Sequence, residues 1–258
     1  MTSGIKLLAL ETATEHCSVA IWQRDAAGQV QILTRRQHAP RQQTELILPM
    51  VDELLAESGL VLTQFTAVAY SCGPGAFTGV RIAAAVAQGL AFGADLPVVP
   101  VSSLQTLAQA AYRQHGARAV LAAFDARMQE IYAGAYALDA DGLMQAITPE
   151  VAGAPATLPA ALVAAWAAHL ASPLAEQAAE QSGGSGATAV AAGSGWATYG
   201  DSLAQTFAVQ QIYADLAPDA EDVATLAAAA VQAGKAVAPE LALPVYLRDD
   251  VWKKLPGR

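Results

Sequence analysis

Gly73-Pro74-Gly75 is the stretch where residue types and spacing come closest to a binding site, because it joins an apolar run to a segment of helical periodicity. The backbone amides of Gly75, Ala76 and Phe77 would point outward at a helix N-terminus, where the helix dipole favours an anion. This geometry predicts a nest for phosphate. The alternative is that the two glycines only allow a tight turn between a strand and a helix.

Two familiar nucleotide motifs do not match this stretch. A P-loop has a Lys-Ser or Lys-Thr pair after its glycines, and none follows here. A dinucleotide site has an acidic residue at the end of the next strand, but the apolar run Val98–Val101 ends in Ser102-Ser103. The phosphate nest and the structural turn therefore both stay open.

Metal and nucleophile chemistry also lack a recognisable pattern. The histidines are His16, His38, His115 and His169. None has a second histidine three or four residues away, so no helical metal clamp is predicted. Cys17 and Cys72 show neither ligand nor redox spacing, and no Ser or Cys carries a hydrolase signature. We therefore assign no catalytic residue and no metal ligand.

The elements that would position the turn are a buried strand before it and a helix after it. Ala67–Ser71 has the length and composition of a buried strand. Thr78 can cap a helix that runs from Gly79 to about Phe92, and small residues leave much of that helix thin. The residues predicted to form the turn and the helix N-terminus are Gly73, Gly75, Thr78, Gly79 and Arg81.

The chain before this unit predicts three strands and a helix. The strands are Ile5–Leu10, Ser18–Gln23 and Val30–Arg35. The helix has apolar residues at helical spacing, at Leu46, Ile47, Met50, Val51, Leu54 and Leu55. Because Pro49 costs about 3 kcal/mol in a helix interior, we expect the helix to kink there or to begin close to it.

A short pattern occurs twice in the chain. Leu7–Leu10 runs into Glu11, then a turn and a strand, and Leu121–Phe124 runs into Asp125, then a turn and the strand Ile131–Tyr136. In each copy a strand ends at a carboxylate and a hairpin returns. This predicts two related domains, each a mixed sheet with helices, with chance similarity as the alternative.

The remaining chain predicts helices over Ala156–Ala171 and Ala220–Gly234, with a short strand at Val190–Ala192 between them. The segment 172–188 is rich in Gly and Ser, which favours a flexible insertion. The tail from Pro244 is aromatic and basic, ending with Lys253-Lys254. It either packs on the protein or serves as a docking segment.

Composition limits the function classes. A chain of 258 residues suggests one large domain or two small ones. The formal net charge of -9 argues against autonomous nucleic-acid binding, which needs a basic surface. No uninterrupted apolar run reaches the roughly 18 residues of a membrane span. An acid comes too early for a signal peptide, so we expect a cytoplasmic protein that does not bind membranes.

Four segments carry a family resemblance: LALETATEHCSVA, SCGPGAFTGVRIAAAVAQGLA, FDARMQEIYAGAY and PVYLRDDVWKKLP. They look like the TsaB family, also called YeaZ, of bacterial tRNA threonylcarbamoyladenosine biosynthesis proteins. The resemblance spans nearly the whole chain, is specific at GPGAFTGVR and is weakest over Ala152–Thr188.

The resemblance implies an α/β fold with the two lobes of the actin, hexokinase and Hsp70 ATPases. It also implies a homodimer that gives way to binding of the catalytic paralogue TsaD. With TsaD and the ATPase TsaE, members help to transfer a threonylcarbamoyl group to the adenosine beside the anticodon of ANN-decoding tRNAs. We therefore expect tRNA contact only through that complex.

The same resemblance suggests how the chain divides. Residues 1–104 would form an N-terminal lobe with the dimerisation helices, and residues 105–217 a second, smaller lobe with the insertion at 172–188. Residues 218–258 would pack back on the first lobe.

Kinases of that fold hold nucleotide with an acid after the first strand, a second acid followed by glycine, and a glycine-rich adenosine loop. The places that resemble these are Glu11, Thr12, Asp125, Gly193 and Gly195. Arg127 departs from the pattern, because its bulk stands where backbone would approach a phosphate, and a structural pair with Asp125 or Glu130 is its expected role. We predict a degenerate nucleotide site and no cofactor required by this chain alone, with ATP or ADP bound only within the complex. A phosphotransferase or ATPase is the alternative.

The resemblance also implies that two helices of one protomer pack on two of another. The residues predicted for this interface are Leu46, Met50, Leu54, Ala83, Ala84 and Ala87. The alternative is that both helices only cover their own sheet. The resemblance, together with the degenerate nucleotide site, therefore implies a non-catalytic partner subunit.

Overall fold

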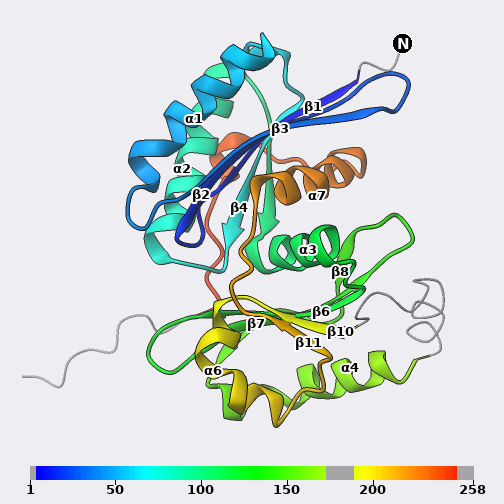
Figure 1. The fold of residues 1–258 in the computed structure, drawn as a ribbon. Coiled ribbons are helices and arrows are strands. Elements are labelled where there is room, and N and C mark those ends of the chain that lie inside the picture. The colour runs from blue at the N-terminus through cyan, green and yellow to red at the C-terminus, as the bar shows by residue number, and fades with distance from the viewer. Residues whose placement is uncertain (1–3, 173–188, 249–258) are drawn as a thin grey trace, which may run out of the picture.

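The computed structural model describes residues 4–172 and 189–248 of the chain. All but the first residue of the expected insertion over 172–188 therefore lies outside the described residues, as do Lys253 and Lys254 of the tail. The described chain forms two lobes, each built around one β-sheet (Figure 1).

The first sheet has five strands in the order β3-β2-β1-β4-β5. They are β1 (Ile5–Glu11), β2 (His16–Arg24), β3 (Val30–His38), β4 (Ala67–Gly73) and β5 (Val98–Ser102). β1, β2 and β3 pair antiparallel through short turns, whereas β4 runs parallel to β1 and β5 parallel to β4. β1 and β4 are almost wholly apolar because helices cover both faces of the sheet.

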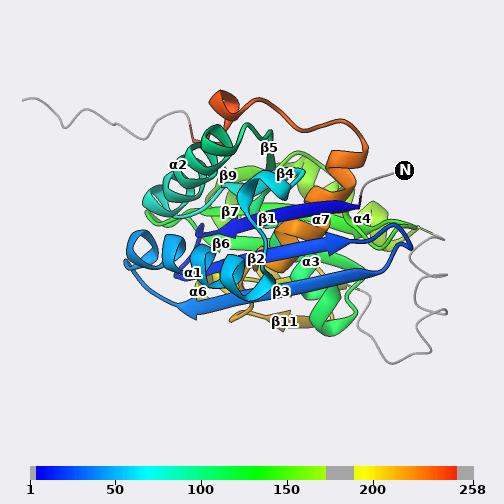
Figure 2. The same ribbon diagram turned by 90° about the horizontal axis from the view of Figure 1, so that it is seen from above.

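Three helices cover the two faces of this sheet, and alternate side chains along each strand pack against one face or the other. They are α1 (Gln43–Ser58), α2 (Phe77–Ala94) and α7 (Ala220–Gln232). α1 and α2 lie on one face of the sheet and α7 on the other (Figure 2). Leu8 packs with the residues of α1 and α2, and its neighbour Leu7 packs with those of α7. The predicted start of α7 at Asp219 is confirmed, since the Asp219 carboxylate accepts the Glu221 amide.

The second sheet repeats the first. It has the order β11-β10-β6-β7-β8, with β9 paired to β7. Its strands are β6 (Ala119–Asp125), β7 (Ile131–Leu138), β8 (Met144–Ala146), β9 (Val151–Gly153), β10 (Ala189–Ala192) and β11 (Gln211–Tyr213). β6, β7 and β8 are antiparallel, and β10 and β11 run parallel to β6. The repeat predicted from the two strand–carboxylate–hairpin segments is therefore present in the topology.

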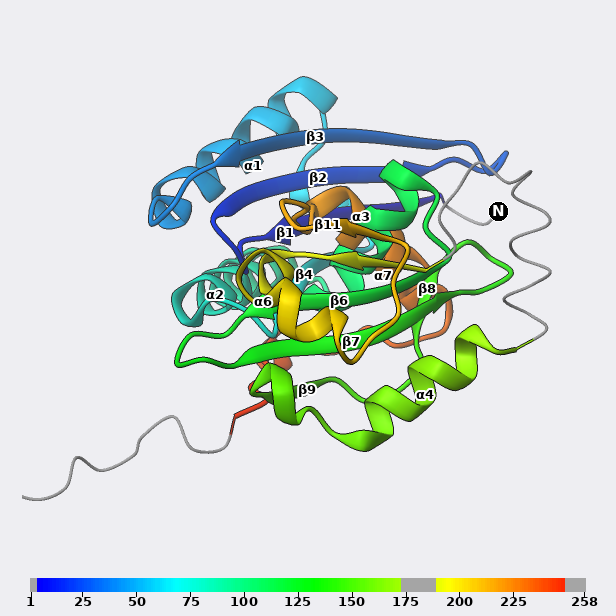
Figure 3. The ribbon, with the colours of Figure 1, turned by 60° about the horizontal axis from the view of Figure 1, so that its bottom comes forward.

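Three further helices cover the second sheet. They are α3 (Ser103–His115), α4 (Ala160–Leu170) and α6 (Ser194–Ala204). α4 and α6 lie on its outer face, and α3 lies on the inner face, where it meets α7 (Figure 3). The layers are thus helix, sheet, helix, sheet, helix. The predicted α/β class with two lobes of mixed sheet and helices is confirmed.

Some local expectations were wrong. α3 was not predicted, because buried polar residues such as Thr106 and Gln109 hide its periodicity. α1 continues through Pro49 from a start at Gln43, so the expected start near the proline is wrong, while the alternative of a kink at Pro49 stays a prediction. Short 3-10 turns occupy Leu62–Gln64, Pro155–Thr157 and Pro239–Leu241, and the second of these delays the start of α4.

The division into lobes at residues 104 and 105 falls at the beginning of α3, which packs on both lobes. The exact domain limits stay a prediction.

The last described residues, Leu243–Arg248, form a segment that we call the strap. It begins on the first lobe, where Tyr70 Oη donates to the Leu243 carbonyl at 3.2 Å and the Val245 amide donates to Cys72 O at 2.7 Å. It ends on the second lobe, where the Arg248 guanidinium pairs with Glu130. The strap therefore ties the two lobes together.

Candidate functional site

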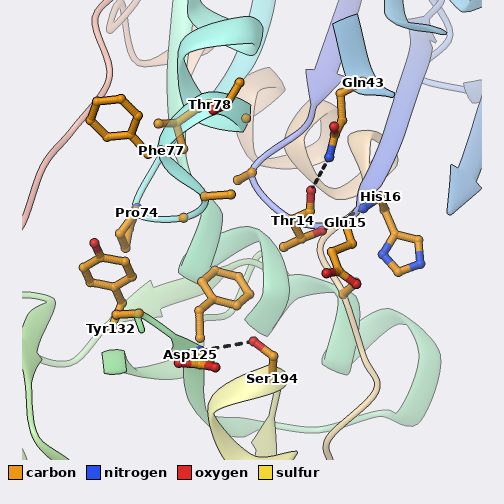
Figure 4. Close-up of a pocket in the computed structure, with 18 of the residues that line it drawn as sticks. Thr14, Glu15, His16, Gln43, Pro74, Phe77, Thr78, Asp125, Tyr132 and Ser194 are labelled. Carbon is orange, nitrogen blue, oxygen red and sulfur yellow. Dashed lines mark hydrogen bonds between the residues drawn. The ribbon is translucent and has the colours of Figure 1, made fainter. Parts of the chain in front are cut away.

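A cleft with a volume of about 1160 Å³ lies between the lobes (Figure 4). One wall contains the β1–β2 turn and the starts of α1 and α2. The other contains the β6–β7 turn, the start of α6 and the segment before α7, and the strap lines one side. The turns that follow the first strand of each sheet thus face each other, as the repeat requires.

The start of α2 differs from the prediction. The helix begins at Phe77 with Ala76 as its N-cap and no side-chain cap, so the assignment of Thr78 as the cap was wrong. Thr78 lies inside the first turn, past the position from which a side chain caps the helix. The amide of Ala76 is already used, since it donates to Ala13 O at 2.8 Å.

The glycines of this turn are explained by close packing. A Cβ at Gly79 would stand 2.0 Å from Thr12 O, and a Cβ at Gly75 would stand 2.6 Å from Ala13 O. The Thr12 hydroxyl donates to Gly79 O at 2.7 Å. α2 therefore sits directly on the β1–β2 turn, which supports the structural reading of these glycines over a phosphate nest.

Two further members of the predicted turn contact the strap. Gly73 has φ of +110°, and a Cβ there would stand 2.8 Å from Val245 O. Arg81 donates to Phe77 O at 2.8 Å, and its guanidinium carbon lies 3.2 Å from the Phe77 ring centroid and 4.7 Å from that of Tyr246. Arg81 thus joins the first turn of α2 to the strap.

Glu11 does not reach the cleft. Its side chain is fully buried, and Ala13 N donates to Oε1 at 2.5 Å. Burial raises the pKa of this carboxyl to about 7, against the opposing effect of that hydrogen bond. Glu11 Oε2 and Ser71 Oγ are buried without a hydrogen-bond partner among the described residues. The assignment of Glu11 and Thr12 to a nucleotide site is therefore corrected, because both side chains are fully buried and neither lines the cleft.

Asp125 does line the cleft. Its amide donates to Ser194 Oγ at 3.1 Å, and its Oδ1 accepts the Arg127 amide at 2.8 Å. Arg127 Nη1 lies 3.8 Å from Asp125 Oδ2, so the predicted pair is confirmed. The Arg127 side chain is 82% exposed, which makes this pair a weak one. Arg248, rather than Arg127, is the partner of Glu130.

Gly193 and Gly195 serve the packing of α6. A Cβ at Gly193 would stand 2.5 Å from Ala123 O, and one at Gly195 would stand 2.8 Å from Ala123 Cβ. The next residue, Trp196, is buried and donates from Nε1 to Leu121 O at 3.0 Å. Neither glycine lines the cleft, which corrects their assignment to an adenosine loop.

These positions do not fit a nucleotide held as the kinases of this fold hold it. Of the five residues predicted for such a site, only Asp125 lines the cleft. The first acid is fully buried, and atoms of Ala123 and Leu107 occupy the space beside the two glycines. Binding of ATP or ADP within a complex stays a prediction.

The structure brings together two histidines that are far apart in the sequence. His16 and His38 are opposite each other in β2 and β3, with ring centroids 5.1 Å apart, and His38 Nε2 lies 3.6 Å from Glu15 Oε2. All three line the cleft. Burial lowers the pKa of His16. Within residues 4–172 and 189–248, no group of three or more His, Cys, Asp or Glu side chains is placed to hold a metal ion.

Sequence reasoning missed one partly buried acid at the junction of the lobes. Glu150 Oε1 accepts Tyr136 Oη at 2.5 Å and also the Ser102 hydroxyl, which caps α3 by accepting from Gln105 N. Burial raises the pKa of Glu150.

A second missed acid is Asp222 on α7, which makes two hydrogen bonds of 2.8 Å with Arg113 on α3. The pKa of Asp222 is raised to about 6, because burial outweighs Arg113. Only the three-dimensional fold brings these partners together.

Four of the six predicted interface residues need correction. Ala83, Ala84, Ala87 and Leu54 are buried in the core of the first lobe. Met50 and Leu46 also pack on this core but keep some accessible surface, so their place in an interface stays a prediction. A side chain without accessible surface cannot contact another protein in this conformation. The small residues therefore let α2 approach its own sheet, as the alternative reading held.

The outward side of α2 carries a different set of small residues. Ala85, Gly89 and Gly93 recur every fourth position and are exposed, beside the 73% exposed ring of Phe92. Together with Gln88 and Glu240 they line a shallow hollow, and a Cβ at either glycine would meet open space. The four-residue spacing of these small residues is present in the sequence, but it identifies an exposed side of α2 only when the buried side of the helix is known.

α2 is also long and apolar enough to match a membrane-spanning helix by length and composition. In this structure it packs on the first sheet, with Ala83, Ala87 and Ala91 fully buried. Its apolar character is accounted for by that core position.

Comparison with known proteins gives consistent matches. Residues 33–253 match the family model of TsaD, described as tRNA N6-adenosine threonylcarbamoyltransferase. The chain is 40% identical to the tRNA threonylcarbamoyladenosine biosynthesis protein TsaB of Escherichia coli K12, covering 98% of this chain and 100% of the relative. It is 39% identical to the protein of the same name from Haemophilus influenzae, covering 99% of both.

A solved structure agrees with these matches. YeaZ from Pseudomonas aeruginosa superposes with a TM-score of 0.78 at 40% identity, covering 94% of this chain and 100% of that one. Identity at this level over the full length of both chains shows a shared family, and the fold agrees with it. The chain therefore belongs to the TsaB (YeaZ) family of tRNA threonylcarbamoyladenosine biosynthesis proteins.

Proposed function

We propose that this protein is a non-catalytic partner subunit in the formation of threonylcarbamoyladenosine next to the anticodon of tRNA. It acts by binding and activating a TsaD protein, together with TsaE. The observation that carries the proposal is the 40% identity to a TsaB protein over the full length of both chains. The paired histidines, one helical turn apart, that the resemblance attributes to TsaD have no counterpart among the four histidines of this chain.

The outward side of α2 is the surface that we assign to the partner. Exposed Ala85, Gly89 and Gly93 would let the backbone of a second helix approach closely, and Phe92 would be the apolar anchor beside that contact. In the absence of TsaD, the same surface would pair with a second copy of the chain. This keeps the predicted helix-to-helix contact but moves it to the opposite side of α2.

Binding of purified variants to TsaD tests this assignment. Ala85→Arg places a charge on the proposed contact and should abolish the complex without lowering the melting temperature. Ala167→Arg introduces the same change at an exposed position of α4 and should leave binding intact. Ala83→Arg should instead destabilise the folded chain by about 3–5 kcal/mol, because it buries an unpaired charge. Normal TsaD binding by Ala85→Arg would contradict the assigned surface.

Reconstitution tests the function itself. Threonylcarbamoyladenosine should form on tRNA when TsaD, TsaE, ATP, threonylcarbamoyl precursors and this protein are combined, and its omission should remove the product. The protein alone should neither hydrolyse ATP nor modify tRNA. Steady-state ATP turnover by the purified chain that disappears in Asp125→Ala would instead favour a phosphotransferase or ATPase.

The proposal includes three expectations about context. The protein would work in the cytoplasm, where tRNA is modified. With a formal net charge of -9 it should bind tRNA poorly alone and contact it only within the complex. ATP or ADP would be bound within that complex rather than required by this chain.

A further inference from the structure

The β6–β7 turn has a backbone that is unfavourable on its own. Arg127, Met128 and Gln129 have φ of +64°, +53° and +62°, so three successive residues with side chains occupy the left-handed region. Residues other than glycine enter this region singly rather than in runs, because the Cβ atom crowds a backbone carbonyl oxygen there. A run of this kind persists only when its surroundings hold it.

Backbone hydrogen bonds and one side chain of the strap hold this turn. Ala126 N donates to Glu130 O at 2.9 Å, and Glu130 N donates to Arg127 O at 3.1 Å. From the strap, Arg248 donates to the same Arg127 oxygen at 3.2 Å and pairs with the Glu130 carboxylate. The side chains of Arg127 and Met128 are 82% and 86% exposed, so their packing contributes little. Arg248 therefore holds the shape of the turn from outside it.

The same arginine ties the turn to the first lobe over a short length of chain. Val245 is fixed on the first lobe, where its amide donates to Cys72 O at 2.7 Å. Two residues separate Val245 from Arg248, so even a fully extended chain spans at most about 11 Å between them. The lobes cannot move far apart on this side while both ends of the strap are held. We call the contacts of Arg248 with Glu130 and with Arg127 O the latch.

The latch lies at the cleft, whereas the main contact between the lobes lies elsewhere. Arg127 from the turn and Tyr246 and Arg248 from the strap all line the cleft. α3 and α7 join the lobes through Arg113 and Asp222, and neither helix contributes to the cleft lining. The lobes are therefore connected at two separate places, one of which is the latch.

Opposing effects act on the latch. The ion pair with Glu130 and the hydrogen bond to Arg127 O favour the closed form. Glu130 is 39% exposed, so salt weakens this pair. Arg248 Nε is buried without a hydrogen-bond partner among the described residues and would regain water on release. Release would also free the turn from its left-handed run.

We propose that Arg248 is a releasable latch that couples the width of the cleft to the shape of the β6–β7 turn. With the latch closed, the strap holds the lobes together on this side and the turn keeps its left-handed run. Release lets the turn relax and the lobes separate about the contact between α3 and α7. A ligand or partner that binds the separated form more tightly opens the latch by that difference in affinity. The latch does not depend on the proposed function.

The width of the cleft is measured on the full chain with two spin labels. Glu45→Cys on α1 and Thr198→Cys on α6 place the labels at exposed positions of the two lobes, while the natural cysteines are buried. Arg248→Gln should lengthen the distance between the labels. Arg41→Gln removes the same charge from the first-lobe wall of the cleft and should leave the distance unchanged.

The shape of the turn is measured by hydrogen exchange of the Glu130 amide, which donates to Arg127 O. Arg248→Gln should speed this exchange by about tenfold to a hundredfold, as loss of a hydrogen bond to a charged group does. Arg41→Gln should not change it. A change in only one of the two measurements would overturn the coupling, and no change in either would overturn the latch.

Two further arms separate the latch from a general loss of stability. Salt at roughly 1 M should produce the changes of Arg248→Gln in the natural protein and add little in the variant. An equal response of both proteins to salt would contradict the latch. Met128→Gly added to Arg248→Gln should recover part of the slow exchange, because glycine adopts a left-handed φ without strain. Exchange as fast as in Arg248→Gln alone would refute the role given to the backbone of the turn.

Discussion

Glu11 should make the stability of this protein depend on pH in an unusual direction. Its carboxyl is fully buried, and burial raises its pKa from 4.5 to about 7. In the unfolded chain the carboxyl ionises near its ordinary pKa of 4.5, whereas in the folded chain it stays protonated up to about pH 7. Rising pH between these two values therefore stabilises the unfolded state relative to the folded state. The contribution of the protonated Glu11 carboxyl to the free energy of unfolding is fully present below pH 4.5 and is lost as pH rises through about 7.

The size of the effect follows from the difference in pKa. Each pKa unit corresponds to about 1.4 kcal/mol, so Glu11 alone should lower the free energy of unfolding by about 3 kcal/mol between pH 4.5 and pH 8. This is a large part of the free energy of unfolding of about 5–15 kcal/mol that is typical of a domain.

Glu11→Gln keeps the shape of the side chain and its acceptor for Ala13 N but cannot ionise. Urea unfolding of both proteins from pH 4.5 to pH 8 measures the difference. The natural protein should lose stability over this range, and Glu11→Gln should lose about 3 kcal/mol less. Asp222, with its pKa raised to about 6, also lowers the free energy of unfolding as pH rises, over a lower pH range. Its effect is the same in both proteins, so it cancels when their pH profiles are compared. Parallel pH profiles would refute the reasoning.

Other perturbations separate structural roles. Arg113→Met should lower the free energy of unfolding by about 3–5 kcal/mol, because it leaves Asp222 buried and unpaired, whereas Arg113→Met with Asp222→Leu should recover much of that loss in the same urea assay. Gly79→Ala should destabilise by about 1–3 kcal/mol, since its Cβ would collide with Thr12 O, and circular dichroism melts will show it. Gly89→Ala meets open space and should be neutral or stabilising by up to about 1 kcal/mol in the same melts, so equal losses in both glycine variants would contradict the packing argument.

Local sequence patterns predicted the elements of the fold well where one physical signal dominated. The strand before Gly73, the hairpins after Glu11 and Asp125, and the helix capped by Asp219 all follow from apolar runs, turn residues and capping. α3 was not predicted, because it lies between the two lobes and buries polar residues that normally mark the exposed side of a helix. Periodicity identifies one apolar face and fails for a helix covered on several sides.

The candidate site was harder to predict because exposure depends on the whole fold. Small side chains occur on several sides of α2, so the sequence alone does not show which side is buried. The position of the sheet decides that Ala83 and Ala87 face inward while Ala85 faces outward. Glu11 ends the first strand, where an acid of a nucleotide site would stand, yet the fold buries its side chain completely. The pairs Glu150–Tyr136 and Arg113–Asp222 join residues with no local relation in the sequence.

The position of α7 has a consequence for how the chain is made. The first sheet is complete once Ser102 has been synthesised, but the face that contains Leu7 is covered by α7, whose last residue is Gln232. At ordinary translation rates the ribosome needs roughly ten seconds to add the intervening chain. During that time an apolar sheet face has no cover from its own sequence. Nascent chains of this protein should therefore engage a chaperone until α7 emerges, and a truncation before Pro218 should aggregate rather than yield a folded first lobe.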